Sequence, residues 1–508
     1  MLNAPRSTPA ARLAAGRVAR DCAVIDVGSN SVRLVIYRLE GRAIWTVYNE
    51  KVLAGLGRGL TETGRLSPDG VEQALDALRR FSALLDAMPN VQVFTAATAA
   101  VREAQDGQEF LHRVETEIGL KLRVISGPEE ARYAAFGVMA GQPNAQGIVG
   151  DLGGASLELT RLGGDARDAV SLPLGPFSVA RAASRFDVEK LRSSIINVLA
   201  PHTKRFRADD LHAVGGAWRN FALLHMRMSG YPLEVLHQYE ISRRDALAAA
   251  HFISSQSQES LGRMPGLSRK RVETLPYAAV LLEALIEQLE LEKLTLSAFG
   301  LREGLLFEGM DATLRKHDPL VAGCAAMATR GSVDSAFGSA LATWVAPVFS
   351  ALPPAFEREA LLTAAACQLA DLGVQLHPDH RADLVFSQVL RAPVPGQTHA
   401  ERAFIAAASY ARHSSNFEPP EPAVISRLLS SERVARARAL GAAIRLGCDL
   451  SGRNTALLGQ TALSLQGPVL ALTVDPGHAD LMLGEQTLRR AGNLATRLGR
   501  RLVVNSQG

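Results

Sequence analysis

Residues 23–40 read AVIDVGSNSVRLVIYRLE, and residues 147–162 read GIVGDLGGASLELTRL. In each stretch an apolar run leads to an aspartate, a turn of glycine and small polar residues follows, and apolar and polar residues then alternate. Such alternation predicts β-strands, and glycine-rich polar clusters predict the turns between them. The pattern therefore predicts two similar β-hairpins, about 125 residues apart, which would face each other across a cleft.

Strands and helices alternate around these hairpins. Helical spacing over residues 68–88 and 107–119 flanks a buried strand that starts at Val91. Residues 211–224 and 294–310 each predict a strand, a glycine turn and a helix. Open α/β sheets bind ligands where their strands end, so these glycines favour a ligand site within an α/β fold.

The C-terminal part of the chain has a different character. After Arg315 the sequence becomes helical and rich in alanine up to about Leu450. A length of 508 residues is enough for several domains. The expected parts are a flexible tail (1–20), two α/β domains (21–135 and 136–311), a helical domain (312–452) and a small α/β unit (453–508).

The charge balance excludes proteins dominated by one sign of charge, such as histone-like proteins. The chain has 55 Lys and Arg residues against 51 Asp and Glu residues. From Ala312 onward it has 19 basic and 15 acidic residues. This mild excess fits either a solvated surface or contact with an anionic polymer, and we expect no nucleic-acid partner.

Cysteine usage and hydropathy bear on the compartment. The four cysteines lie far apart and form no CxxC pair, so neither a disulfide framework nor a zinc cluster is indicated, and we expect a cytoplasmic protein. The uncharged stretch Ser335–Phe356 is long enough to cross a bilayer. Glycine and proline interrupt it, so it predicts a buried helix and a turn, and no membrane partner.

The two hairpin turns have the composition of a phosphate clamp. Glycines let backbone N–H groups converge on an anion, hydroxyl groups add donors, and each preceding aspartate can hold a hydrated magnesium ion. A single turn of this kind is often present for steric reasons alone, but its repetition favours phosphate binding. The expected phosphate-binding residues are Gly28, Ser29, Asn30 and Ser31 in the first turn, and Gly153, Gly154, Ala155 and Ser156 in the second.

These motifs resemble those of the superfamily of acetate and sugar kinases, heat-shock chaperones and actin. Within it, the chain resembles the exopolyphosphatase and guanosine pentaphosphate phosphohydrolase family. The resemblance spans residues 25–304 and rests on the segments IDVGSNSVRL, LGRGL, ATAAVREA, ISGPEEAR, DLGGASLEL, AVGGAWR and SAFGLREG. It implies two actin-like (ribonuclease H-like) domains around a cleft, followed by a helical HD-like domain and a small α/β unit.

Glu129 and Glu130 need separate interpretations, because adjacent helix positions point about 100° apart. The attacking water of a phosphohydrolase needs a carboxylate within hydrogen-bond reach. The resemblance to the family's SG-x-EE-A motif points to Glu130 as this catalytic residue. The alternatives are Glu129, or a helix-capping role alone.

The resemblance also implies a divalent metal, Mg²⁺ or another cation. Asp151 matches the family's acidic site residue and is assigned to the metal. Glu158 follows seven residues later in the next predicted strand and could reach the same cleft, although it could also be an ordinary strand-surface acid. Asp26 could share in binding the metal or in organising water.

Arginines are candidates for gripping phosphate oxygens, because a planar guanidinium can bind two oxygens at once. The resemblance adds Arg102 to the catalytic residues Glu130, Asp151 and Glu158. For Arg33 and Arg302 a structural salt bridge explains the residue at least as well. The glycines of AVGGAWR match the region that lies along the nucleotide in the superfamily's kinases.

In the C-terminal part, CQLADLGVQLHPDH from Cys367 resembles a helix of HD-type phosphohydrolases, whose metal site needs a consecutive His-Asp pair. Ala370 stands where that histidine should be, before Asp371, and His377 and His380 follow. We therefore expect an HD-like domain without the metal pair. In long exopolyphosphatases, which look similar, this region extends the polymer-binding path.

The leading hypothesis is a magnesium-dependent exopolyphosphatase that releases terminal orthophosphate from inorganic polyphosphate. The alternative enzyme hydrolyses guanosine pentaphosphate with the same clamp. A third possibility is an actin-like sensor that binds polyphosphate or nucleotide without turnover. The resemblance further implies a homodimer.

Overall fold

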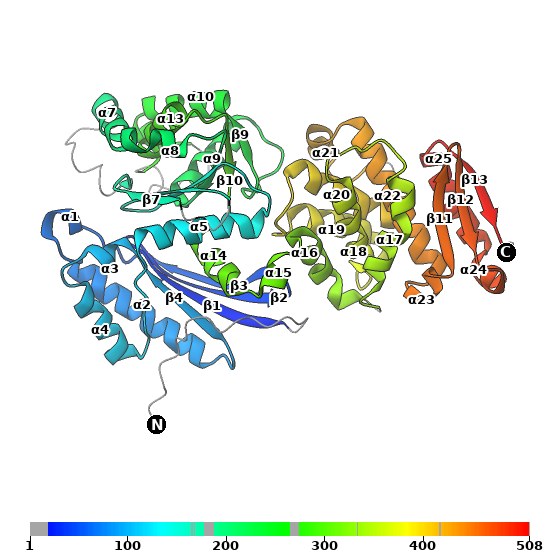
Figure 1. Cartoon of the computed structure of the whole chain (residues 1–508), viewed down its shortest axis with the longest axis horizontal. Helices are drawn as coiled ribbons and strands as arrows, with labels where there is room; N and C mark the ends of the chain where they lie inside the picture. The colour runs from blue at the N-terminus through cyan, green and yellow to red at the C-terminus, as the bar shows by residue number, and fades with distance from the viewer. Residues whose placement is uncertain are drawn as a thin grey trace. The chain divides into compact units, whose positions relative to one another are not determined.

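The computed structural model describes residues 19–163, 166, 168–176, 187–264, 274–332, 334–415 and 418–506. The chain divides into two compact units, Met1–Lys316 and His317–Gly508, each of which is visible in Figure 1. The expected tail, residues 1–20, lies outside the described residues except for its last two. The finer domain boundaries expected at 135/136 and 452/453 remain predictions.

The first sheet of the N-terminal unit has the strand order β3-β2-β1-β4. β1 pairs antiparallel with β2 and parallel with β4, and β2 pairs antiparallel with β3. The hairpin predicted over residues 23–40 is therefore the centre of this sheet. Its strands are β1 (Arg20–Val27), β2 (Val32–Glu40), β3 (Ala43–Val52) and β4 (Gln92–Ala97).

The second sheet repeats this plan, with the order β7-β6-β5-β8-β10-β9. β5 pairs antiparallel with β6 and parallel with β8, and β6 pairs antiparallel with β7. The prediction of two similar α/β halves is confirmed, because the central hairpin, its third strand and its parallel neighbour recur in the same arrangement. The strands are β5 (Ile148–Leu152), β6 (Leu157–Arg161), β7 (Ala169–Leu172), β8 (Asp210–Val214), β9 (Glu240–Ser242) and β10 (Lys293–Leu296).

Helices cover both faces of the first sheet. Helices α2 (Pro68–Asp86) and α4 (Gly107–Ile118) pack Leu78, Phe81 and Phe110 against one face. Helices α5 (Gly127–Gly141) and α14 (Leu301–Gly309) pack on the other face, against strand residues that alternate with the first set. The amphipathic helices predicted over residues 68–88 and 107–119 thus correspond to α2 and α4.

Helix α5 lies between the two sheets (Figure 1). Its Tyr133 and Ala140 belong to the core on the first sheet, whereas Ala134 and Val138 pack with Val149 of β5. A helix that is apolar nearly all round is expected at such a position. The N-terminus of α5 is therefore held from both sides.

The crossing of α5 and α14 depends on glycine. A Cβ atom added to Gly304 would lie 1.9 Å from the backbone oxygen of Tyr133, and one added to Gly137 would lie 2.1 Å from that of Gly300. Both distances are far shorter than any contact between unbonded atoms. The two helix backbones consequently meet without intervening side chains.

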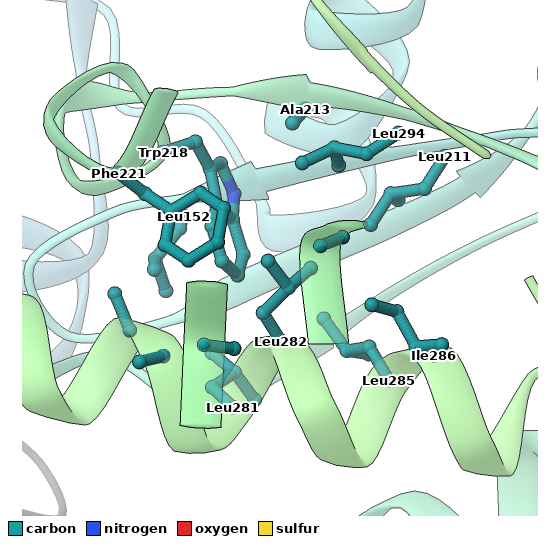
Figure 2. Packing of buried hydrophobic residues seen from close by; sticks show 14 of the residues in the cluster. Leu152, Leu211, Ala213, Trp218, Phe221, Leu281, Leu282, Leu285, Ile286 and Leu294 are labelled. Carbon is teal, nitrogen blue, oxygen red and sulfur yellow. The ribbon is translucent and has the colours of Figure 1, made fainter. Parts of the chain in front are cut away.

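A large apolar core lies beneath the second sheet. Figure 2 shows the leucines of α13 (Leu275–Gln288) facing Leu211, Ala213 and Leu294 of the sheet, beside Trp218 and Phe221. All of these side chains are buried. The other elements of this unit are α1 (Leu60–Thr63), α3 (Ala99–Glu103), α7 (Val188–Leu199), η1 (Ala200–His202), α8 (Thr203–Phe206), α9 (Gly216–Met228), α10 (Arg243–Ser255), α11 (Gln258–Gly262) and α15 (Ala312–Arg315).

The C-terminal unit is mainly helical and ends in a sheet of order β11-β12-β13. Its helices are α16 (Pro319–Ala328), η2 (Thr329–Gly331), α17 (Phe337–Phe349), α18 (Glu359–Gln368), η3 (Leu369–Asp371), α19 (Pro378–Arg391), α20 (His399–His413), α21 (Pro422–Leu428), α22 (Ser431–Ser451), α23 (Thr455–Leu458), η4 (Pro476–His478), α24 (Ala479–Met482) and α25 (Glu485–Arg497). Its strands are β11 (Thr461–Gln466), β12 (Val469–Val474) and β13 (Arg501–Asn505).

Within the described part of the chain, no helix combines the length and the apolar character needed to cross a membrane. The stretch Ser335–Phe356 contains α17, whose Leu341, Val345 and Val348 are buried in the protein core. The four cysteines are buried free thiols.

The apolar pair Val124–Ile125, followed by the turn residues Ser126–Pro128, predicts a short strand that ends in a turn. Val124 and Ile125 do not form a regular strand, and Val124 makes a single parallel bridge to Ala97. Ile125 N–H donates to the Ala97 carbonyl, after which the capped helix α5 begins at once. The N-cap at Ser126 ends the extended segment before a second pair can form.

We expect Gly304→Ala to destabilise the N-terminal unit by about 1–3 kcal/mol, because the added methyl group must push α14 away from α5. Urea unfolding measures this loss. Gly492→Ala in α25 is the matched control, since an added Cβ there meets nothing within 4 Å and alanine favours a helix. Equal midpoints for Gly304→Ala and the wild type would contradict this account of the crossing.

Candidate active site

The two glycine turns have the same backbone geometry. Gly28 N–H donates to the Ser31 carbonyl at 3.0 Å, and Gly153 N–H donates to the Ser156 carbonyl at 2.9 Å. Both turns follow a central strand and lead into its antiparallel partner. The sequence repeat is therefore also a repeat of hydrogen bonding.

Neighbouring glycines support each turn from outside. Gly57 N–H donates to the Ser29 carbonyl at 2.8 Å, and Gly175 N–H donates to the Ala155 carbonyl at 3.0 Å. A Cβ atom on Gly175 would lie 2.2 Å from the carbonyl carbon of Ala155, so only glycine fits there. The turns are thus held in shape before any ligand arrives.

Glu129 is the capping residue of α5. Its carboxylate accepts hydrogen bonds from the backbone N–H and hydroxyl of Ser126, and Ser126 in turn caps the Glu129 N–H. Arg123 also pairs with Glu129 at 2.6 Å. These contacts form a capping box and hold the carboxylate at the helix start.

Glu130 follows on the same first turn and has different surroundings. Its carboxylate lies 3.4 Å from an Nη1 of Arg102, and its side chain is 13% exposed. Burial raises the pKa of Glu130 well above its ordinary value, and the nearby charges of Glu158 and Asp151 raise the pKa further. Glu130 is thus a buried carboxylate among other carboxylates, with one arginine favouring its ionised form.

Arg102 is fixed at the end of α3 by the backbone. Its Nη1 donates to the Ile125 carbonyl at 2.7 Å, just before α5 begins. The same nitrogen reaches Glu130. The guanidinium therefore lies at the N-terminus of α5 beside this carboxylate.

Asp151 and Glu158 are direct cross-strand partners on β5 and β6. Burial raises the pKa of Asp151 to about 6, and the negative charge of Asp26 contributes. Burial, followed by the charge of Asp151, raises the pKa of Glu158 to about 7. Ser171 Oγ donates to a Glu158 oxygen at 2.8 Å, so Glu158 is not a strand-surface acid.

Asp26 faces the same region and pairs with Arg302 of α14 at 2.9 Å. Its charge raises the pKa values of Asp151 and Glu130. The electrostatic effects among these side chains place Asp26, Glu130, Asp151 and Glu158 in one neighbourhood. Arg302 thus makes the salt bridge that the sequence left open for it.

The acidic neighbourhood suits a hydrated magnesium ion. In the described residues, no three His, Cys, Asp or Glu side chains are arranged to enclose a metal by themselves. Mg²⁺ usually keeps several waters and binds through one or two carboxylates together with substrate phosphates. Buried carboxylates that raise one another's pKa would gain from such a cation, so Asp151 and Glu158 fit it.

Sequence reasoning missed two cations of this site, Lys51 and Arg219. Lys51 is the direct cross-strand partner of Arg33, although like charges at such positions repel. Burial, and the charges of Arg302 and Arg219, lower the pKa of Arg33 to about 10. Burial also lowers the pKa of Lys51 and of Arg219. A group of cations under mutual repulsion is suited to binding an anion.

The strand-end glycines AVGGAWR bring backbone close to the acids. Gly215 has φ +115°, and an added Cβ would lie 2.5 Å from the Leu152 carbonyl and 3.2 Å from Asp151 Oδ1. Gly216 begins α9, and an added Cβ there would meet nothing within 4 Å. The first glycine serves close packing beside Asp151.

The HD-like residues of the C-terminal unit do not come together. Asp371 is buried in η3 and lies 3.7 Å from Arg453, whereas His377 and His380 are exposed at the start of α19. The two histidine rings lie 5.9 Å apart. The described residues thus give no cluster of these three side chains.

Two similar α/β halves and buried carboxylates beside paired glycine turns define a phosphohydrolase with an actin-like fold. Residues 35–313 match the model of the Ppx/GppA phosphatase family, and residues 325–504 match that of the exopolyphosphatase C-terminal region. The first match covers more than half of the chain. The chain belongs to the Ppx/GppA phosphatase family, and it is a hydrolase.

Solved structures agree with this family. The Aquifex aeolicus family member is 26% identical, with a TM-score of 0.52, and the match covers 59% of this chain and 100% of that chain. An exopolyphosphatase from Cytophaga hutchinsonii is 22% identical, with a TM-score of 0.52, covering 57% and 99% of the two chains. The second likeness is one of fold alone.

The raised carboxylate pKa values predict a pH-dependent stability in metal-free buffer. Asp151 and Glu158 hold protons up to about pH 6 and 7 in the folded protein, whereas the unfolded chain releases them near pH 4. Their contribution to stability is therefore present at low pH and lost as the pH rises through 7. We expect Glu158→Gln to raise the melting temperature at pH 8 more than at pH 5, measured by calorimetry in chelator.

Glu115→Gln is the control for that experiment, because Glu115 is exposed on α4 and its replacement should have a similar small effect at both pH values. A Glu158→Gln gain that is the same at pH 5 and pH 8 would contradict the assigned pKa.

Proposed function

We propose that this protein is an exopolyphosphatase that hydrolyses the terminal phosphoanhydride bond of inorganic polyphosphate. The observation that carries the choice of substrate is the C-terminal unit, whose residues 325–504 match the exopolyphosphatase C-terminal model. Hydrolysis of guanosine pentaphosphate is the second candidate, since the cations around Arg33 would suit either phosphate-rich substrate.

Two helices of that unit support a linear polyanion as substrate. Arg438 and Arg445 lie two turns apart on α22, and Arg490 and Arg497 lie two turns apart on α25, which packs against α22. Burial and the charge of Arg438 lower the pKa of Arg497, and burial and the charge of Arg490 lower the pKa of Arg445. The two helices therefore run antiparallel with arginine facing arginine.

We call these four residues, Arg438, Arg445, Arg490 and Arg497, the arginine seam. Its surroundings favour polyphosphate over a nucleic acid as the ligand. Asp449 contacts these arginines through Arg490 at 3.1 Å. Single-stranded nucleic acids are usually held by aromatic side chains on which the bases stack. Neither α22 nor α25 contains Phe, Trp or Tyr, so the seam offers charge without stacking.

In the proposed reaction, Glu130 orients the attacking water and accepts its proton. Its place at the N-terminus of α5, beside Arg102, supports this role, since the arginine favours the ionised form while burial and the neighbouring acids raise the pKa and favour proton acceptance. Arg102 and the N–H groups of the two turns would stabilise charge on the transferred phosphoryl group. No covalent phosphoenzyme is needed.

Asp151 and Glu158 are the residues that would hold Mg²⁺, and Asp26 would orient water bound to it. The cation would neutralise charge on the phosphate oxygens as they separate from the leaving group. Arg302 holds Asp26 in place at 2.9 Å. A homodimer and a cytoplasmic location are part of the same proposal.

The test of the reaction is orthophosphate release from long-chain polyphosphate and from guanosine pentaphosphate, each with Mg²⁺. We expect faster release from polyphosphate and a fall in kcat of about 100-fold or more for Glu130→Gln, because the general base is lost. Glu129→Gln is the control next in sequence. Glutamine can also fill this position of a capping box, so the variant loses mainly the ion pair with Arg123 and should keep most of the turnover.

Preference for guanosine pentaphosphate would replace the leading function with the second candidate. Binding of polyphosphate to a filter without release of orthophosphate would indicate a sensor.

Removing charge from the seam tests the choice of a polymeric substrate. We expect Arg438→Gln/Arg497→Gln to raise KM for long-chain polyphosphate about tenfold, equal to about 1.4 kcal/mol of binding, and to leave KM for tripolyphosphate unchanged. Arg244→Gln/Arg501→Gln removes two exposed arginines elsewhere and is the matched control. Equal KM changes for both double variants would show that only net charge matters.

A further inference from the structure

Strand β7 and the residues after it touch both the carboxylate Glu158 and the second glycine turn. Ser171 is the direct strand partner of Glu158, and its hydroxyl donates to a Glu158 oxygen at 2.8 Å. Four residues later, Gly175 N–H donates to the Ala155 carbonyl at 3.0 Å. The segment Ser171–Gly175 thus holds the acid with a side chain and the turn with its backbone.

The same segment is attached to the protein core. The hydroxyl of Tyr277 on α13 donates to the Leu174 carbonyl at 2.8 Å, and both residues are buried. Leu174 itself belongs to the large core beneath the second sheet. A buried hydrogen bond to backbone in an apolar core fixes a segment more firmly than packing alone.

Ser171 also meets the helix that carries Glu130. A Cβ atom added to Gly127, the first residue of α5, would lie 2.7 Å from Ser171 Cβ. No side chain can therefore separate the helix start from β7. Ser171 therefore contacts both the start of α5, which carries Glu130, and Glu158 on β6.

We propose that Ser171 is a positioning residue, which orients the Glu158 carboxylate for phosphoanhydride hydrolysis, and that Tyr277 anchors the segment Ser171–Gly175 that carries it. The inference rests on the proposed role of Glu158 in the reaction. Without the Ser171 hydroxyl, the carboxylate keeps its hydrogen bond with Ser156 of the second turn but loses the donor on β7, so it can turn about the remaining contact. A carboxylate that points in the wrong direction lowers kcat more than it weakens the binding of substrate.

The experiment is a double-mutant cycle in the full-length protein with Mg²⁺, using Ser171→Ala, Glu158→Gln and both together. We expect Ser171→Ala to lower kcat by about 10- to 100-fold, the range for a hydrogen bond to a charged group, with KM little changed. On the Glu158→Gln background, Ser171→Ala should have no further effect, because Ser171 acts through Glu158. Tyr277→Phe, which removes only a hydroxyl, should lower kcat by a smaller factor.

Thr160→Val is the matched control. Thr160 lies on the same strand as Glu158 and faces the same side, and its buried hydroxyl has no hydrogen-bond partner among the described residues. Its removal should leave kcat within about twofold, since no hydrogen bond is lost. An effect of Ser171→Ala that equals that of Thr160→Val, or that multiplies fully with Glu158→Gln, would overturn the proposal.

A crystal structure of Ser171→Ala keeps the inference testable apart from the reaction. We expect the Glu158 carboxylate to leave its wild-type position while β6 and β7 stay paired, and an unmoved carboxylate would refute the positioning role. Kinetics with both polyphosphate and guanosine pentaphosphate reveal whether the proposed substrate is wrong. If the wild type hydrolyses neither, the proposed function fails, and the crystal structure still decides the role of Ser171.

Discussion

The N-terminal unit depends on the close crossing of α5 and α14. Because Gly304 meets the Tyr133 backbone directly, α5 can lie between two sheets and belong to both cores. Each helix also carries site residues: Glu130 lies at the start of α5, and Arg302 on α14 pairs with Asp26 of the first hairpin. The contact between the two helix backbones thus sets how far Glu130 on α5 lies from Arg302 on α14 and from its partner Asp26.

The site gathers buried groups of like charge, which repel one another. Burial and neighbouring carboxylates raise the pKa values of Glu130, Asp151 and Glu158. Nearby, three cations have lowered pKa values, namely Arg33, Lys51 and Arg219. Folding tolerates this arrangement because large apolar cores lie on both sides of it. The repulsion at the candidate site lowers the stability of the folded protein there, and the apolar cores compensate for this loss.

Local patterns allowed much of this to be predicted from the sequence. The hairpins, the glycine turns and the capping segment SGPEE are set by neighbouring residues, and the family follows from their combination. Lys51, Arg219 and Ser171 could not be found in this way, because only strand pairing and helix packing bring them to the site. The strand predicted at Val124 failed for a local reason, since the N-cap at Ser126 follows too soon.

The repeated hairpins differ at one telling position. Asp26 is paired across its hairpin with Arg33, and Asp151 is paired at the corresponding place with Glu158. The same structural slot therefore holds a cation in one half and an anion in the other. The two halves share one design but differ in charge, so a phosphate group between them would meet an arginine beside Asp26 on one side and two carboxylates on the other.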